Sequence, residues 1–231
     1  MQTTAVRYVV RPMDLGDISQ VMDIERVSFP SVWPSTAFKR EIQHNRLARY
    51  LVATEQPAGE GESMDDEPRP AVPTQPPLSP PRLGRWLTEL RRLFGTEDDI
   101  EPAPHRDLII GFVGVWLIVD EAHIVTIAVR DDYRRRGIGE LLLIAAIELA
   151  LMNERGSASL ECRVSNDAAI ALYEKYRFRR LGIRPRYYSD NREDAIIMTA
   201  EGIDLASYQA LFRELKAEHR QHFGNYQFDF F

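Results

Sequence analysis

The chain of 231 residues contains little of what several kinds of protein require. It has a single cysteine, Cys162, which excludes an internal disulfide framework and a zinc site built from several cysteines. Its longest hydrophobic runs, residues 108–119 and 141–152, have 12 residues each, whereas a membrane-spanning helix needs about 20. The first residues also lack the hydrophobic core of a signal peptide. These absences predict a soluble, cytoplasmic protein without a transmembrane segment.

The chain also lacks an excess of positive charge. Its 29 Lys and Arg residues and 35 Asp and Glu residues give a formal charge of −6. This balance argues against a general nucleic-acid-binding protein but not against a basic peptide substrate. None of the five histidines has the spacing of a metal site with Cys162, so we predict no metal. Hydrophobic residues make up 44% of the chain, which is enough for a packed core.

Proline is concentrated in one stretch of the chain. Residues 56–106 hold 10 of the 14 prolines together with 10 acidic and 6 basic residues, so we predict a largely disordered, acidic insert. Within it, residues 82–95 have leucine, tryptophan and phenylalanine at helical spacing and four arginines outside that stripe. Two interpretations of this amphipathic helix stay open. It packs on its own domain, or it contacts a membrane surface or a partner.

The other 180 residues alternate between β-rich runs and helical patterns. The β-rich runs are residues 6–11, 49–54, 108–119, 123–129, 157–164, 178–183 and 195–199, with a hairpin link expected over 120–122. The helical patterns follow Asp14, begin at Ser35, cover 137–153 and 166–176, and follow Ile203. This succession predicts a mixed α+β or α/β domain. The aromatic tail within residues 202–231 either covers the domain's own hydrophobic surface or forms a dimer seam, and the oligomeric state stays open.

The most informative stretch lies between a strand and a long helix. The strand ends near Val129, and the helix opens with Arg134, Arg135, Arg136, Gly137, Ile138 and Gly139. The glycines let a ligand approach the backbone, the helix start offers free N–H groups and a positive dipole end, and the arginines add charge. Such a loop can hold a diphosphate, although it is neither a P-loop nor a dinucleotide-binding fingerprint. An arginine-rich surface turn is the alternative.

The same six residues match the Arg/Gln-x-x-Gly-x-Gly/Ala motif of the GCN5-related N-acetyltransferase (GNAT) family, which this chain resembles. The resemblance implies acetyl-CoA as the cofactor, with its diphosphate on this loop and its pantetheine arm on the backbone of Ile127, Ala128 and Val129. It covers residues 5–55 and 107–200. It also implies the family's fold, a twisted, mostly antiparallel central sheet of six to seven strands flanked by helices.

Two residue types that carry acid–base chemistry follow. Side chains in the strand 157–164 alternate, so Cys162 lies on the hydrophobic face and Glu161 on the other. Cys162 is expected to be a small, buried hydrophobic residue. Glu161 is either a solvated or ion-paired strand residue or a base for an incoming ammonium group. Tyr173, seven residues after the helix-capping Asn166, is by itself most simply a core aromatic residue.

As a block, the stretch LECRVSNDAAIALYEKYRF resembles the bacterial ribosomal-protein alanine N-acetyltransferases, a branch of the GNAT family. In that branch the corresponding glutamate is the general base, the tyrosine is the general acid, and the asparagine contacts CoA. The resemblance therefore implies that Glu161 and Tyr173 are catalytic and that Asn166 contacts acetyl-CoA.

Two further stretches resemble the substrate-binding parts of protein N-terminal acetyltransferases. Tyr187 and Tyr188 begin a stretch similar to a Tyr-Tyr…Glu-Asp-Ala…Met signature, whose tyrosine pair lines the peptide groove. Residues 29–38 are similar to a Phe-Pro-Trp-Ser segment, with two additional residues before Trp33. The resemblance implies that Phe29, Trp33, Tyr187 and Tyr188 bind the substrate. Without it, the tyrosines are a locally packed pair in a hairpin loop.

The resemblance thus implies direct transfer of the acetyl group of acetyl-CoA to the α-amino group of a protein. The partner it implies is an N-terminal peptide, that of ribosomal protein S18 with its N-terminal alanine, and no nucleic acid takes part. Two alternatives stay open. One is acetylation of another amine, on a small molecule or a lysine, and the other is a non-catalytic acyl-CoA-binding module.

Overall fold

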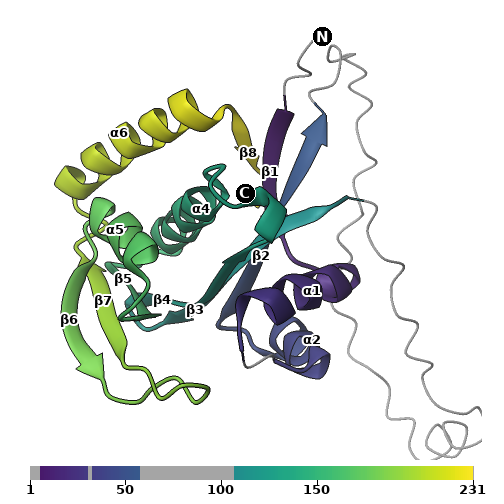
Figure 1. Cartoon of the computed structure of the whole chain (residues 1–231). Coiled ribbons are helices and arrows are strands. Elements are labelled where there is room, and N and C mark those ends of the chain that lie inside the picture. The colour runs from purple at the N-terminus through teal and green to yellow at the C-terminus, as the bar shows by residue number, and fades with distance from the viewer. Residues whose placement is uncertain (1–5, 31–32, 58–106, 231) are drawn as a thin grey trace, which may run out of the picture. The chain divides into compact units, whose positions relative to one another are not determined.

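The structure, a computed structural model, describes residues 6–30, 33–57 and 107–230 (Figure 1). The insert expected over 56–106 lies outside the described residues except for its first two. The helix expected over 82–95 lies outside them entirely. Residues 56 and 57 extend the preceding strand, which runs further than the sequence pattern predicts. The insert and its helix therefore stay predictions.

Eight strands form a single sheet with the spatial order β6-β7-β5-β4-β3-β2-β1-β8. Five of the seven neighbouring pairs are antiparallel, whereas β4–β5 and β1–β8 are parallel. The strands are β1 (Val6–Pro12), β2 (Ala48–Pro57), β3 (Ile109–Ile118), β4 (Glu121–Val129), β5 (Ser157–Arg163), β6 (Arg179–Arg184), β7 (Ala195–Glu201) and β8 (Tyr226–Phe228). The expected mixed fold with a mostly antiparallel sheet is confirmed. An eighth strand, β8, comes from the aromatic tail and joins the seven expected ones.

Five α-helices are described, and they cover both faces of the sheet (Figure 1). They are α1 (Ile18–Ser28), α2 (Ser35–His44), α4 (Ile138–Met152), α5 (Asp167–Lys175) and α6 (Ala206–Phe223). Because side chains alternate along a strand, β2 contributes to two cores. Tyr50 and Val52 pack with α1 and α2, whereas Leu51 and Ala53 pack on the face that carries α4, α5 and α6. None of the described helices is long and apolar enough to cross a membrane.

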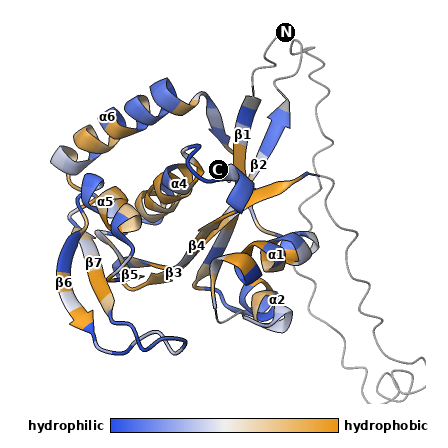
Figure 2. Cartoon of the chain, viewed as in Figure 1, coloured by the Kyte–Doolittle hydropathy of each residue, from blue (hydrophilic) through white to orange (hydrophobic). Residues whose placement is uncertain are grey.

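The helix α4 is apolar on nearly all sides (Figure 2). Ten of its fifteen residues are buried, which is typical of a helix enclosed by other elements. Its N-cap is Gly137, whose φ of 77° lies in the left-handed region that glycine adopts without a steric penalty. The helix expected over residues 137–153 is confirmed, and it starts at the loop that the sequence singles out.

The C-terminal residues cover their own domain. The helix α6, expected after Ile203, buries Tyr208, Phe212 and His219. After α6 the chain turns and β8 pairs in parallel with β1, with Tyr226 opposite Tyr8. Of the two roles left open for the tail, it therefore has the first, covering the edge and one face of the sheet.

The turn between β3 and β4 is tighter than the link expected over residues 120–122. It consists of Val119 and Asp120, because Ile118 pairs directly with Glu121. Val119 has a φ of 50°, in the left-handed region, and its side chain is 86% exposed. A β-branched residue is strained in that conformation, and no burial offsets the strain.

Replacing Val119 with glycine is expected to raise the free energy of unfolding by about 0.5–1 kcal/mol. The left-handed conformation costs an L-residue roughly 1–2 kcal/mol, and the greater flexibility of glycine cancels part of that gain. Urea unfolding followed by circular dichroism measures the change. Val119→Ala keeps the Cβ atom and should gain less. A Val119→Gly protein less stable than the wild type would show that this turn is not strained.

Candidate active site

The sheet opens at its centre, where two parallel strands separate. The strands β4 and β5 are paired between residues 121–124 and 157–160, and beyond these residues they diverge. A bulge that leaves Val125 without a partner in β3 lies at the point of separation. Over residues 125–129, β4 therefore has no partner on its β5 side among the described strands. No strand pairing occupies its backbone groups on that side, where a ligand can bind, although the Val129 carbonyl accepts a hydrogen bond from Arg134 Nε at 3.4 Å.

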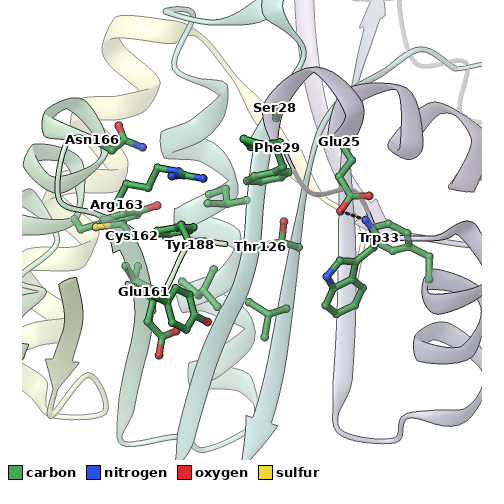
Figure 3. Close-up of a pocket in the computed structure, with 18 residues that line it drawn as sticks. Glu25, Ser28, Phe29, Trp33, Thr126, Glu161, Cys162, Arg163, Asn166 and Tyr188 are labelled. Carbon is green, nitrogen blue, oxygen red and sulfur yellow. Dashed lines mark hydrogen bonds between the residues drawn. The ribbon is translucent and has the colours of Figure 1, made fainter. Parts of the chain in front are cut away.

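A cleft with a volume of about 320 Å³ lies over this opening (Figure 3). The residues around it come from α1, α2 and the segment between them, from β4, β5 and α5, and from the loop between β6 and β7. Of the site residues predicted from the sequence, the cleft brings together Phe29, Trp33, Ile127, Glu161, Asn166, Tyr173, Tyr187 and Tyr188. In Figure 3, Glu161 and Tyr188 lie on one side and Trp33 on the other.

Glu161 is an enclosed carboxylate between two cationic or ionisable side chains. Its side chain is 8% exposed, its Oε1 atom forms an ion pair with Arg184 Nη2 at 2.9 Å, and its Oε2 atom lies 3.2 Å from His123 Nε2. The two faces of β5 are as expected, because Cys162 is buried in the hydrophobic core while Glu161 faces these partners. Glu161 is therefore both ion-paired and part of the cleft.

His123 is a candidate functional residue that the sequence pattern does not reveal. Its Nδ1 atom lies 2.8 Å from Ser159 Oγ, and the Ser159 hydroxyl donates a hydrogen bond to Glu121. Only the register of the β4–β5 pair reveals it. In that register His123 lies opposite Ser159, which is two residues before Glu161. Within the described residues, no group of three or more His, Cys, Asp and Glu side chains could hold a metal ion.

Tyr173 lines the cleft from α5 and is 5% exposed. Burial raises the pKa of its hydroxyl above the ordinary value of 10, so the phenol keeps its proton at neutral pH. Its ring also packs on Phe178, with centroids 5.9 Å apart, so it is a core aromatic residue as well. Burial likewise raises the pKa of the nearby Cys162 thiol, to about 11. Cys162 is therefore a neutral thiol and a poor nucleophile.

Tyr187 and Tyr188 form the aromatic pair of the loop between β6 and β7. Their ring centroids are 5.2 Å apart at 89°. The guanidinium carbon of Arg163 lies 3.9 Å from the centre of the Tyr188 ring, and that of Arg184 lies 5.7 Å from the centre of the Tyr187 ring. Burial raises the pKa of Tyr188 to about 12, while Tyr187 is 47% exposed. The pair is packed locally and also borders the cleft.

Arg163 ties this loop to β5. Its guanidinium binds Asp190 at 2.9 Å and Glu193 at 3.1 Å. Glu193 also accepts a hydrogen bond from the backbone N–H of Ser165 at 2.9 Å. Hydrogen bonds from the side chain and the backbone of Ser165 lower the pKa of Glu193 from 4.5 to about 2. The tyrosine loop is thus fixed to the segment between β5 and α5.

The opposite wall of the cleft contains a carboxylate from α1, Glu25, that the sequence analysis does not single out. Glu25 is 4% exposed, and its Oε1 atom accepts a hydrogen bond from the backbone N–H of Trp33 at 3.2 Å. Burial raises the pKa of Glu25. Trp33 packs on Phe38, with ring centroids 5.9 Å apart. Glu25 therefore helps to hold the segment that carries Trp33.

The loop Arg134–Gly139 lies beyond the cleft lining. It follows the free edge of β4 and includes the first two residues of α4. Its three arginines are exposed, whereas the side chain of Ile138 is buried, which leaves its backbone for contact with a ligand. A Cβ atom at Gly139 would meet Val129 Cγ2 at 3.7 Å, an ordinary contact, so the protein itself does not require glycine there. Exposed cations, a helix N-terminus and open space at Gly139 fit a diphosphate.

The remaining predicted cofactor contacts divide between the loop and the cleft. Ala128 is buried and Val129 packs on the core, so each has mainly its backbone to offer. Asn166 lines the cleft, and its Oδ1 atom accepts a hydrogen bond from Ala169 N at 3.2 Å, which caps α5 as expected.

Known proteins with similar sequences include acetyltransferases. A family model described as the acetyltransferase (GNAT) family matches residues 62–178. A putative ribosomal protein bS18-alanine N-acetyltransferase of Bacillus subtilis is 33% identical over 192 residues, which cover 83% of this chain and 94% of that protein. A ribosomal protein bS18-alanine N-acetyltransferase of Escherichia coli is 49% identical over 91 residues, which cover 38% of this chain and 60% of that protein.

A solved structure with a similar fold is the crystal structure of the ribosomal-protein-S18-alanine N-acetyltransferase from Escherichia coli. Its TM-score is 0.57 at 23% sequence identity, and the match covers 84% of this chain and 94% of that chain. At this identity the likeness concerns the fold.

Removal of the Ser165 hydroxyl is expected to raise the pKa of Glu193 from about 2 toward 4.5, because that hydroxyl is the first of the groups that stabilise the carboxylate. A carboxyl pKa lowered by folding adds stability above about pH 4.5, and this contribution is lost as the pH falls toward 2. NMR titration of the Glu193 side-chain carboxyl carbon in Ser165→Ala measures the shift. Ser189→Ala, in the loop between β6 and β7 that carries Glu193, is the control and should leave the pKa of Glu193 unchanged. An unchanged pKa of Glu193 in Ser165→Ala would show that the Ser165 hydroxyl does not stabilise this carboxylate.

Proposed function

The chain belongs to the GNAT acetyltransferase family, and within that family we propose that it is a protein N-terminal acetyltransferase. As a family member it is an acetyl-CoA-dependent N-acetyltransferase. The proposal is that it transfers the acetyl group directly to the α-amino group of a polypeptide. The N-terminal alanine of ribosomal protein S18 is the proposed substrate.

The observation that carries the proposal is the composition of a single cleft. It combines a carboxylate paired with a histidine, a buried phenol that keeps its proton, and an aromatic pair at its border. The first two are a base and an acid of the kind that amine acylation requires. The aromatic pair and the wall formed by Phe29 and Trp33 leave an opening suited to the end of an extended peptide.

The amine must lose a proton before it can attack. An α-amino group has a pKa of about 8, so much of it is protonated at neutral pH. Because the Ser159 hydroxyl donates to Glu121, the His123 Nδ1–H donates to Ser159, and the His123 Nε2 atom faces the Glu161 carboxylate. His123 and Glu161 act as one unit that takes the proton from the ammonium group, directly or through a water.

The acyl transfer itself needs stabilisation of charge at two atoms. Backbone N–H groups on the free edge of β4 near Val129 donate to the thioester carbonyl oxygen. Tyr173 donates its proton to the departing thiolate sulfur as the bond from carbonyl carbon to sulfur breaks and the bond to nitrogen forms. The first proton of the ammonium group leaves through His123 and Glu161. The second proton, which the nitrogen loses as the amide forms, restores the Tyr173 hydroxyl, so the reaction ends with an amide, a thiol and one released proton.

The residues proposed to hold acetyl-CoA follow the free edge of β4 into α4. Acetyl-CoA supplies the activated acetyl group. The backbone of Ile127, Ala128 and Val129 would hold its pantetheine arm, and Asn166, which also lines the cleft, would contact it. The loop Arg134–Gly139 and the first turn of α4 would hold the diphosphate.

Acetylation of synthetic peptides tests the proposed function. One peptide begins with the alanine of ribosomal protein S18, a second has the same sequence with a blocked N-terminus and an internal lysine, and spermidine represents small amines. Mass spectrometry after incubation with acetyl-CoA should find one acetyl group on the N-terminal residue of the first peptide. Acetylation of the lysine or of spermidine, with the free N-terminus untouched, would refute the proposal in favour of another amine. CoA binding without acetylation of any of these would favour a non-catalytic module.

Glu161→Gln and Tyr173→Phe are each expected to lower kcat by roughly 10²–10⁴-fold, the usual contribution of a general base or acid. The affinity for CoA should stay unchanged, because neither substitution touches the loop Arg134–Gly139. Steady-state kinetics with the alanine peptide and calorimetry with CoA measure the two quantities.

Two matched substitutions outside the cleft serve as controls. Glu174→Gln changes a carboxylate that pairs with Arg180 on the surface, and Tyr208→Phe removes a buried hydroxyl that donates to the Tyr176 carbonyl at 3.1 Å. Both controls should keep the wild-type kcat. Wild-type turnover in Glu161→Gln or Tyr173→Phe would remove that residue from the mechanism.

A further inference from the structure

The C-terminal helix reaches the residue at which α4 begins. His219 Nε2 lies 3.0 Å from the carbonyl oxygen of Gly137. Phe223 packs on the other side of the same residue, because a Cβ atom built at Gly137 would lie 2.4 Å from Phe223 Cγ. Two side chains of α6 thus contact Gly137, the N-cap of α4, which lies more than 80 positions earlier in the sequence.

The end of α6 is held firmly in this place. Lys175 of α5 binds Glu140 of α4 at 2.9 Å and Glu218 of α6 at 3.2 Å, so one ammonium group links three helices. After α6, β8 pairs with β1 at the edge of the sheet, and Figure 1 shows this turn from the helix to the sheet. The contacts with Gly137 are therefore part of a fixed arrangement and not those of a loose tail.

The contacts act on a residue that needs an external constraint. Gly137 has a φ of 77°, and glycine populates many other conformations about as readily. Its carbonyl accepts hydrogen bonds both from Leu141 N at 2.9 Å and from His219, and the Phe223 ring closes the space into which the backbone could otherwise rotate. Burial lowers the pKa of His219, so its neutral form is present at neutral pH and donates through Nε2.

We propose that α6 is a positioning element for the acetyl-CoA loop, in which His219 and Phe223 hold Gly137 in its left-handed conformation. With Gly137 fixed, the N–H groups that open α4 already point toward the diphosphate before it binds. Preorganisation of this kind raises affinity because less conformational freedom is lost on binding. The inference rests on the proposed placement of the diphosphate at residues 134–139.

Calorimetry with CoA alone tests the proposal, with no peptide present. Phe223→Ala and His219→Ala should each weaken CoA binding by about tenfold, which corresponds to about 1.4 kcal/mol. His219→Gln, whose side-chain amide can still donate to the Gly137 carbonyl, should restore most of the affinity. In kinetics the KM for acetyl-CoA should rise while kcat at saturation stays within about twofold of the wild type. Amide hydrogen exchange at residues 138–141 should become faster in Phe223→Ala.

Lys216→Ala is the matched control, because Lys216 links α6 to Glu148 in the middle of α4 and does not contact the loop. It should lower stability slightly and leave CoA affinity unchanged. Wild-type affinity in folded Phe223→Ala and His219→Ala would overturn the proposal, and so would an equal loss in Lys216→Ala. If Phe223→Ala does not fold, Phe223→Leu and the two His219 variants decide. Failure of peptide acetylation leaves this binding readout intact, so the two proposals can fail separately.

Discussion

The separation of β4 from β5 after Ile124 and Leu160 is the constraint on which the other features depend. Parallel strands inside a sheet normally satisfy each other's backbone groups, and here one strand is left with a free edge. The separation is possible because each strand keeps its other neighbour, β3 for β4 and β7 for β5. The buried, all-round apolar helix α4 packs on β3 and β4. The outcome is a cleft whose floor is backbone and whose walls carry the ionisable side chains.

The same geometry explains how one cleft holds both an ionised carboxylate and a protonated phenol. A carboxylate is useful as a base near an ammonium group, but a buried carboxylate without partners would be costly. Glu161 is stabilised from outside the cleft by Arg184 and from β4 by His123, whose own ring is fixed through Ser159. Tyr173 lies in the opposite environment, where burial keeps its hydroxyl protonated. The proposed base and the proposed acid thus differ in their surroundings as well as in residue type.

Local patterns predict most of the fold, and long-range register accounts for what they miss. The apolar run after Gly137 and the alternation around Glu161 predict α4 and the two faces of β5 correctly. The pairing of His123 with Glu161 depends on which residues of β4 and β5 lie opposite each other, and neither segment contains that information. The same holds for Tyr226 beside Tyr8, and for His219 and Phe223 on Gly137. At position 137 the predicted diphosphate loop needs glycine for packing as well, because a Cβ atom there would collide with Phe223.

The central claim is that this cleft brings an α-amino group to the acetyl carbon of acetyl-CoA. The most direct test is the affinity of two matched conjugates measured by calorimetry. In one, CoA is joined through an acetyl bridge to the α-amine of an alanine-starting peptide. In the other, it is joined to a lysine side chain of the N-terminally blocked peptide. The account predicts that the first conjugate binds on the order of 100-fold more tightly than CoA, because both halves of the cleft are engaged at once, and that the second binds like CoA alone. Equal affinity of the two conjugates would contradict it.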